Sequence, residues 1–528
     1  MYKLTINKTK FLAVVALVIF AHLSGWGAEP VEVRDSIYSS VLGEERPLWL
    51  IFPKDYQPEA SGRYDVIYVI DGEWNTTFAG QVHSFLSGPD GKFMPPNVII
   101  VGIPNLYKGD LNMRLRDFTP VYAQEIPVSG GGVKFLSFLK NELIPHINKT
   151  YPTNPDRNTF LGSSLGGMFC LYSMLTDPNL FKSYVVVDPG CLFNDFYINK
   201  LALEKLESLN GLAINLFIGG RENAYRIMGT DGLATALRTK APVTLNWRCE
   251  IYPDESHFTT MWKTVFDGFK YAYAGFAPAV PAYNRVLDYP YKGTAYLRIT
   301  PDNGIVLKNK PFTIWCYDWF PELLRYTADG SEPSTGSPRM KMENRFSGPV
   351  SLRVRSFYTR GEYDKGGFSG RFTTGAIFAP IQKPVGIRAG GMNYRYYEGD
   401  WDSLPDFSKL RPVRSGFGGQ DSDLNVLGGQ SNSAYVLDGY VEIPRVGYYI
   451  FELDGGDGFK IAVGDRSLIN NKTGLLETYM VPLAKGFYPI HVEYFHKKGG
   501  NGLHRVYVRP EGRTDIPIPT HWLYGSNR

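Results

Sequence analysis

The sequence has few cysteines, and their number and spacing argue against zinc sites, dithiol redox motifs and a disulfide framework. Four occur in 528 residues, at Cys170, Cys191, Cys249 and Cys316. None shows the C-x-x-C spacing of zinc sites or dithiol redox motifs, and the number does not suggest a disulfide framework. We therefore expect buried free thiols that belong to the cores of their domains.

A strong excess of charge of either sign is also absent. The chain has 56 Lys and Arg against 52 Asp and Glu, a net charge of +4. No basic patch interleaves with aromatic residues, so nucleic acid is not an expected partner. Hydrophobic residues make up 43% of the chain, as in ordinary globular proteins, and the length predicts about three domains.

Long apolar runs are missing except near the N-terminus. Lys3, Lys8 and Lys10 precede the apolar run at 11–23, and SGWGA, small residues except for Trp26, follows at 24–28. This order predicts a secretory signal peptide at 1–28, and hence a secreted or periplasmic protein. The run is shorter than the ~20 residues that a membrane span needs, so an uncleaved anchor is the less favoured alternative. No transmembrane span is expected in the mature chain.

Strand-like and helix-like patterns alternate between residues 29 and 277. The strand patterns are mostly apolar on both faces, and they lie at 46–53, 65–71, 97–103, 158–164, 184–190, 213–220 and 245–253. Helical patterns, such as 133–151 and 258–276, lie between and after them. Such alternation predicts an α/β domain with a mostly parallel sheet covered by helices.

The pattern changes after a proline-spaced linker at 276–283. Helical periodicity ends there, and short strand patterns alternate with turn signals to the C-terminus. A second break at 377–386 divides this region. We therefore predict a multidomain chain in which two all-β sandwich domains, at 284–376 and 387–528, follow the α/β domain.

A G-x-S-x-G motif at 162–166 gives the first chemical signal. A strand pattern precedes Ser164 and a helix pattern follows it, which is the context of a serine nucleophile on a sharp turn. Acyl transfer also needs backbone donors for the oxyanion. We expect one from the N–H of Leu165 and the other from Glu73 or Trp74, in the loop after the strand at 65–71.

A serine hydroxyl needs a base, and the base needs an acid to orient it. His257 is the one histidine downstream of Ser164 within this domain, and it follows the strand at 245–253. Glu222 follows the strand at 213–220 and is the favoured acid. Three other carboxylates remain possible: Asp231, Asp254 and Asp188.

With these residues in place, residues 35–275 resemble the esterase D family of α/β-hydrolases. The resemblance rests on FLGSSLGGMFCLYSML (160–175), LFIGGRENAYR (216–226) and YPDESHF (252–258), among other segments. It implies catalytic roles for Ser164, His257 and an acid near Glu222. Members often carry Gly-His-Ser-Leu-Gly-Gly, and Ser163 stands here in place of that histidine.

The two β-domains resemble modules found in glycosidases. YTADGSEPSTGSP (326–338) resembles the C-terminal sandwich of chitobiases, and GMNYRYYEGDW (391–401), together with 440–471 and 486–512, resembles the protective-antigen-type sandwich. Lectin members of the latter family carry two adjacent Asp residues that hold calcium. The matching pair here, Gly456-Asp457, lacks one carboxylate, which argues against calcium-dependent sugar binding. The acyl-transfer chemistry implies no metal or organic cofactor.

These features predict a secreted serine carboxylesterase that removes feruloyl or acetyl groups from an ester-decorated polysaccharide or oligosaccharide. Trp74, Tyr107 and Phe118 are candidate substrate contacts, since their rings could stack on such a group. The alternatives are an esterase for siderophores or other small acyl esters, and a non-catalytic glycan-binding surface protein. The sequence does not indicate an oligomeric state.

Overall fold

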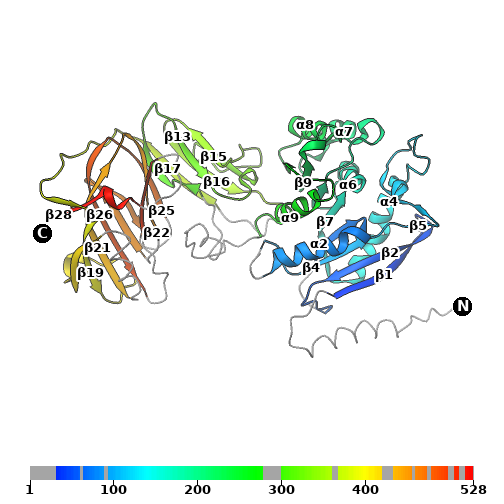
Figure 1. Cartoon of the computed structure of the whole chain (residues 1–528), viewed down its shortest axis with the longest axis horizontal. Helices are drawn as coiled ribbons and strands as arrows, with labels where there is room; N and C mark the ends of the chain where they lie inside the picture. The colour runs from blue at the N-terminus through cyan, green and yellow to red at the C-terminus, as the bar shows by residue number, and fades with distance from the viewer. Residues whose placement is uncertain are drawn as a thin grey trace. The chain divides into compact units, whose positions relative to one another are not determined.

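The computed structural model describes most of the chain. The described residues are 31–59, 64–88, 93–276, 299–359, 367–418, 432–454, 458–471, 477–497, 505–510 and 518–526. They fall into two compact units, Met1–Phe276 and Ala277–Arg528 (Figure 1). The signal-peptide segment at 1–28, all but the first residue of the linker at 276–283, and the pair Gly456-Asp457 lie outside the described residues. Within the described residues, no helix combines the length and the apolar character needed to cross a membrane.

An eight-stranded sheet forms the centre of the first unit, in the order β1-β2-β4-β3-β7-β8-β9-β10. Strand β2 pairs antiparallel with both of its neighbours, and every other pair is parallel. The strands are β1 (Val31–Ser39), β2 (Glu44–Phe52), β3 (Tyr64–Ile70), β4 (Val98–Ile103), β7 (Thr153–Ser163), β8 (Ser183–Val187), β9 (Ile214–Arg221) and β10 (Leu245–Tyr252). The short pair β5 (Tyr107–Lys108) and β6 (Leu111–Asn112) stands apart from this sheet. The α/β fold predicted for this part of the chain is confirmed.

Helices cover both faces of the sheet. They are α2 (Gly72–Ser87), α3 (Arg114–Phe118), α4 (Gly132–Phe138), α5 (Ile144–Thr150), α6 (Leu165–Thr176), α7 (Phe193–Lys205), α8 (Thr230–Lys240) and α9 (Thr260–Ala272). A Cβ on Gly268 of α9 would lie 2.5 Å from Val185 of β8, and one on Gly167 of α6 would lie 3.3 Å from Val186. Neighbouring residues of a strand point to opposite faces, so α6 and α9 pack on opposite sides of β8.

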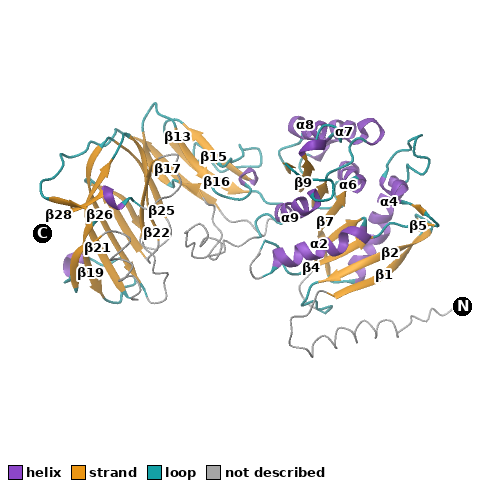
Figure 2. Ribbon diagram, viewed as in Figure 1, coloured by secondary structure: helices purple, strands orange, loops and turns teal. Residues whose placement is uncertain are grey.

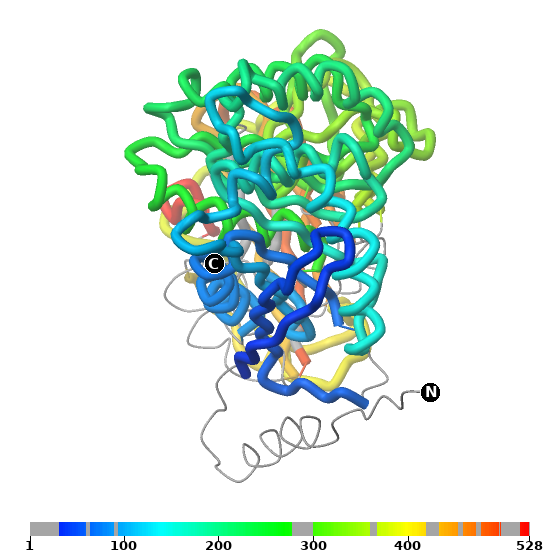
Figure 3. Tube along the Cα trace, turned by 90° about the vertical axis from the view of Figure 1, so that its right-hand side faces the viewer, coloured from blue at the N-terminus to red at the C-terminus, as the bar shows by residue number. Residues whose placement is uncertain are grey.

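The central strands form where the sequence is continuously apolar. All residues of β3, β4 and β8 are buried, as expected for parallel strands with helices on both sides. Strand β1 lacks this signal, because most of its side chains are exposed or half-buried and it pairs only with β2. Figure 3 shows this dark-blue β1–β2 hairpin at the edge of the unit that faces the viewer. The helix predicted at 133–151 is divided by a π-turn at Leu139–Leu143, between α4 and α5.

The second unit is rich in strands (Figure 2). The first group comprises β11 (Ile299–Thr300), β12 (Asn303–Val306), β13 (Phe312–Cys316), β14 (Leu324–Thr327), β15 (Glu343–Phe346), β16 (Val350–Ser356) and β17 (Gly367–Thr374). The second comprises β18 (Ile387–Ala389), β19 (Met392–Glu398), β20 (Arg414–Gly418), β21 (Ser433–Ile443), β22 (Gly447–Asp454), β23 (Gly458–Val463), β24 (Arg466–Asn471), β25 (Glu477–Leu483), β26 (Gly486–His496), β27 (Arg505–Pro510) and β28 (Leu523–Ser526).

One sheet crosses the boundary that the sequence placed at 377–386. Its order is β14-β16-β17-β12-β25-β22-β27, so strands of both predicted sandwiches share it. The crossing is a parallel pair in which β12 lies beside β25. Side chains support it, since Asp302 Oδ2 accepts from Thr478 N at 2.7 Å and Leu307 N donates to the Tyr448 hydroxyl at 2.9 Å. The two β segments therefore belong to one compact unit and share a sheet.

Candidate active site

The candidate residues gather at the carboxyl edge of the sheet in the first unit. Strands β7, β8, β9 and β10 are parallel neighbours, so their carboxyl ends meet at one edge. Ser164 follows β7, Asp188 follows β8, Arg221 ends β9, and His257 lies between β10 and α9. Open α/β sheets bind their ligands at this edge.

Ser164 occupies a sharp turn between β7 and α6. Its backbone is in a conformation that L residues rarely adopt, with φ 57° and ψ −121°, and it is the N-cap of α6. Its N–H donates to Val187 O at 2.8 Å, and its carbonyl accepts from Gly190 N at 2.9 Å. A Cβ on Gly162 would lie 2.5 Å from Gly166 O, so the turn requires a glycine there. This is the local geometry expected of the motif, and it leaves Ser164 partly exposed.

His257 pairs with Asp188. The His257 Nδ1 atom lies 2.5 Å from Asp188 Oδ2. An ionised carboxylate only accepts hydrogen bonds, so Nδ1 carries the proton of this bond and Nε2 is the ring nitrogen left for a hydroxyl. Asp188 is 1% exposed, whereas 29% of the His257 side chain is exposed. The backbone of Asp188 also has a positive φ, 38°, and its N–H donates to Gly219 O at 2.7 Å.

Arg221 is a second partner of the same carboxylate. Its Nε donates to Asp188 Oδ2 at 2.7 Å, and its side chain is 22% exposed. Sequence analysis did not single out Arg221. The signal was its place at the end of the apolar strand β9, directly before the glutamate that was favoured as the acid.

The structure does not pair His257 with Glu222, and the expectation that Glu222 would orient this histidine is wrong. Glu222 begins a 3₁₀ turn, Glu222–Ala224, and is exposed. Of the alternatives, Asp231 lies in the first turn of α8, where its Oδ1 accepts from Gly232 N, and Asp254 is exposed in the turn after β10. Asp188 was kept as an alternative, and it is the carboxylate that contacts the imidazole.

The expected oxyanion donors are the first N–H groups of two helices. Leu165 is the first residue of α6 and Glu73 the second residue of α2, and N–H groups at these positions have no partner within the helix. The Trp74 N–H differs, because it donates to Asp71 O at 3.0 Å. Of the two residues considered in that loop, Glu73 is therefore the favoured donor, because the Trp74 N–H already has a backbone acceptor.

A buried ion pair holds the loop that carries Glu73. Asp71, with φ 55°, accepts from Arg114 Nε at 2.6 Å and from Arg114 Nη2 at 2.8 Å, and Asn105 Nδ2 adds a bond of 2.8 Å. Arg114 Nη2 also lies 3.3 Å from Ser163 O. Arg114 thus connects the start of α2 to the strand that presents Ser164.

The aromatic candidates separate by burial. Trp74 is 60% exposed, and Tyr107 is exposed with its hydroxyl accepting from Asn112 Nδ2 at 2.9 Å. Phe118 is 1% exposed and packs on Phe135 and Phe169. The expectation that Phe118 contacts substrate is therefore wrong, because its ring belongs to the core.

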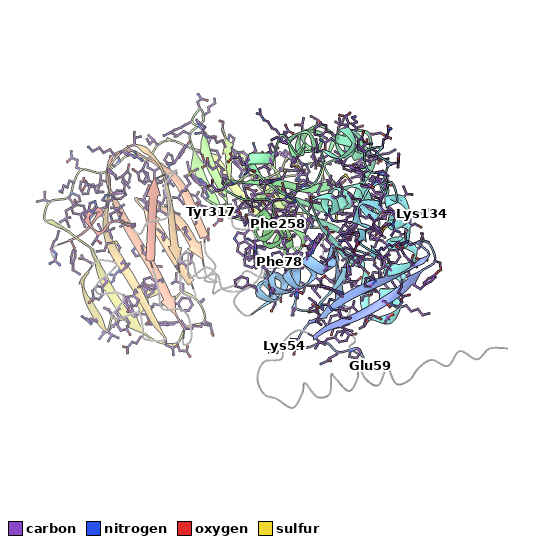
Figure 4. The ribbon with its side chains drawn as sticks, turned by 45° about the vertical axis from the view of Figure 1, so that its right-hand side comes forward. Lys54, Glu59, Phe78, Lys134, Phe258 and Tyr317 are labelled. Atoms are coloured by element: carbon purple, nitrogen blue, oxygen red, sulfur yellow. The ribbon has the colours of Figure 1, made fainter. Side chains whose placement is uncertain are left out.

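Two exposed aromatic residues near His257 were not predicted. Phe258 is 83% exposed and follows His257 directly, and Trp262 packs edge-to-face on Phe78 of α2 at 4.3 Å. Figure 4 labels Phe78 on α2 and Phe258 on the segment between β10 and α9. Within the described residues, no group of three or more His, Cys, Asp or Glu side chains is placed to hold a metal ion.

Comparison with known proteins gives two family matches. The Esterase model, described as "Putative esterase", matches residues 39–203, and the PA14 domain model matches residues 427–521. The second match confirms the protective-antigen-type resemblance over that range.

Several curated relatives are named as esterases. Ferri-bacillibactin esterase BesA of Bacillus subtilis is 30% identical over 199 residues, which are 35% of this chain and 68% of the relative. Siderophore triacetylfusarinine C esterase of Aspergillus fumigatus is 27% identical over 162 residues, 30% of this chain and 55% of the relative. This chain therefore spans about half the length of the second relative.

Among solved structures, an IroE-like serine hydrolase from Shewanella oneidensis is 26% identical to this chain, with a TM-score of 0.43. The match spans 49% of this chain and 85% of the hydrolase chain. The identity to BesA extends over more than two thirds of that relative, and the Esterase model matches the segment that carries Ser164 and Asp188. On this evidence, the chain belongs to the esterase family that this model defines.

Proposed function

We propose that the first unit is a serine carboxylesterase that uses Ser164 as nucleophile, His257 as general base and Asp188 as the acid. One observation carries this proposal. The bond between His257 Nδ1 and Asp188 Oδ2 lies at the sheet edge where the turn after β7 presents Ser164. That combination supports the proposal, because it would supply a base in the required tautomer at the same sheet edge as a serine at a helix N-terminus.

The proposed reaction is a two-step acyl transfer. Ser164 Oγ attacks the ester carbonyl while His257 Nε2 takes its proton, and Asp188 stabilises the imidazolium. The N–H groups of Leu165 and Glu73 hold the oxyanion. His257 then protonates the leaving alcohol, and water attacks the acyl-enzyme with the help of the same imidazole.

We propose a siderophore ester as the substrate class. The support is three curated relatives, which are named as esterases of ferri-bacillibactin, triacetylfusarinine C and apo-salmochelin. The exposed rings of Trp74 and Phe258 are compatible with a substrate that presents flat or apolar groups. The polysaccharide hypothesis rested on the resemblance of the two β segments to modules found in glycosidases. It is now the competing outcome of the test.

The test measures hydrolysis of p-nitrophenyl acetate, ferri-bacillibactin, triacetylfusarinine C and feruloylated xylan by the full chain and by Ser164→Ala. Turnover of the siderophore esters, lost in Ser164→Ala, supports the proposal. Ferulate release from xylan without siderophore turnover would overturn the substrate class and keep the serine esterase. Activity that survives Ser164→Ala would overturn the mechanism.

We also propose that the protein acts outside the cytoplasm, on the basis of the sequence pattern at 1–28. N-terminal sequencing of protein expressed in an exporting bacterial host tests this point. A start near residue 28 supports export with cleavage, and a start at Met1 contradicts it.

A further inference from the structure

We infer that Arg221 is a positioning residue that keeps His257 unprotonated and aimed for catalysis, acting through Asp188. The inference rests on the proposed function, because it concerns the base of that reaction. It goes further by assigning a role to a side chain outside the triad.

The topology places Arg221 between the two partners. Strand β9 lies between β8 and β10, so the segment that carries His257 reaches across the end of β9 to contact Asp188. Arg221 is the last residue of β9 and pairs in register with Tyr252, the last residue of β10. A side chain at this position reaches the carboxylate oxygen that the histidine also contacts.

One carboxylate oxygen accepts from both Arg221 and His257. Asp188 Oδ2 lies 2.7 Å from Arg221 Nε and 2.5 Å from His257 Nδ1. Asp188 is almost completely buried, and a buried carboxylate is stable only with such partners. The guanidinium is a permanent cation, so the carboxylate stays paired whether His257 is charged or neutral.

This shared oxygen has an electrostatic consequence. The positive charge of Arg221 offsets part of the negative charge that would otherwise stabilise the imidazolium of His257. Without Arg221, the buried carboxylate would have His257 as its cationic partner among the residues that the structure describes, and it would favour the protonated ring. A protonated histidine cannot accept the Ser164 proton, so Arg221 would keep the base usable at lower pH.

Arg221 also fixes the direction of the carboxylate. The backbone at Asp188 has φ 38°, a conformation that a non-glycine residue adopts only when its surroundings hold it there. The bond from Nε, which has a fixed direction in the planar guanidinium, supplies one such restraint. A lysine keeps the charge but loses that direction, which separates the two effects experimentally.

Other ionisable groups around His257 do not substitute for Arg221. Glu222 after β9 and Asp254 after β10 are exposed, and Glu255 is paired with Lys263 of α9 at 2.6 Å. Burial raises the pKa of the Cys191 thiol well above its ordinary value, so this neighbour of Asp188 stays neutral. Asp231, in the first turn of α8, hydrogen-bonds Gly232 N.

The test is the pH dependence of kcat/KM for p-nitrophenyl acetate, measured with the full chain as wild type, Arg221→Gln and Arg221→Lys. We expect the acidic limb of Arg221→Gln to move up by on the order of 1 pH unit, with activity largely recovered above the limb. Arg221→Lys should keep the limb within about 0.3 unit of wild type and lower kcat without changing KM. The exposed Arg226, five residues further on, gives the matched control, and Arg226→Gln should leave the limb unmoved.

A purely structural role gives a different result. If Arg221→Gln lowers kcat/KM by one factor at every pH, the inference is wrong. Circular dichroism and thermal unfolding identify any variant that fails to fold. If Arg221→Gln does not fold, Arg221→Lys tests the inference through its separate effects on kcat and on KM. A higher KM with kcat unchanged in Arg221→Lys would mean that only substrate binding is weakened, and this result would also overturn the inference.

The proposed function fails separately. If the wild type hydrolyses no ester, NMR titration of the imidazole signals still compares the midpoint of His257 in wild type and Arg221→Gln, with His257→Ala assigning its signal. A higher midpoint in Arg221→Gln supports the coupling even without activity, and an unchanged midpoint removes it.

Discussion

Asp188 and His257 are in hydrogen-bond contact although the strands that precede them, β8 and β10, are not neighbours in the sheet. The contact joins a buried residue at the end of β8 to a half-exposed one that follows β10. It decides between the carboxylates that could serve the histidine, and the first prediction follows from it.

Asp188→Asn should lower kcat by about 10⁴, the effect of the equivalent change in a well-characterised triad, because an amide can stabilise the wrong tautomer of the histidine. Glu222→Gln is the matched control, and it should change kcat by no more than about twofold, as expected for an exposed side chain. Steady-state kinetics with p-nitrophenyl acetate measure both. The reverse order of effects would return the acid to Glu222.

Trp74→Ala should raise KM for siderophore esters by about two- to tenfold, because an exposed ring beside the oxyanion loop is lost from contact with the substrate. KM for p-nitrophenyl acetate should change less, since the acyl group is small. Tyr38, a similarly exposed aromatic residue on the edge strand β1, provides the control substitution Tyr38→Ala. Equal effects of the two substitutions would exclude Trp74 as a substrate contact.

Arg114→Gln should destabilise the first unit by about 3–5 kcal/mol, because Asp71 would remain buried without its cationic partner. The double variant Asp71→Asn with Arg114→Gln removes both charges and should recover part of this loss. Chemical denaturation followed by tryptophan fluorescence measures the free energy of unfolding of each variant. Equal stability of the single and double variants would show that the unpaired charge of Asp71 is not the cause of the loss.

His491 should make the second unit less stable as the pH rises through about 9. Its Nδ1 lies 2.7 Å from Asp438 Oδ1 and its Nε2 lies 2.9 Å from Glu493 Oε1, and these bonds raise the pKa of His491 to about 9. The pKa of histidine in an unfolded chain is about 6.5. A raised folded-state pKa gives stabilisation that is complete below the unfolded value and disappears as the pH passes the folded value.

Thermal unfolding of wild type and His491→Gln between pH 6 and pH 10 measures this contribution. The difference in Tm between the two proteins should be largest at pH 6 and should shrink toward pH 10. A difference that is constant across this range would show that the histidine acts through packing alone.

The sequence predicted the α/β fold because seven of the eight strands overlap segments with strand-like, mostly apolar patterns, and helical patterns lie between them. It also indicated Ser164 and His257, since a strand–turn–helix context and a single downstream histidine are local signals. The partner of His257 is not a local property. It depends on how far the segment after β10 reaches across the sheet. Glu222 is the more plausible acid only when the end of β9 is considered without the neighbouring strands.

Two further features escaped sequence analysis for similar reasons. The sequence around Phe118 does not distinguish a buried aromatic residue from an exposed one. Its packing on Phe135 and Phe169 shows that the ring belongs to the core. The pairing of β12 with β25 joins residues more than 170 positions apart. No periodicity within either segment announces such a pair.

The shared sheet of the second unit determines where the chain can be cut. A protein divided at 377–386 would separate β12 from β25 and leave each half with a bare strand edge. Unpaired edges recruit other strands, so each half expressed alone should aggregate. The part of this chain that can be moved to another protein as a stable piece is therefore the whole region from β11 to β28, and any glycan-binding assay of the C-terminal segment needs the middle segment attached.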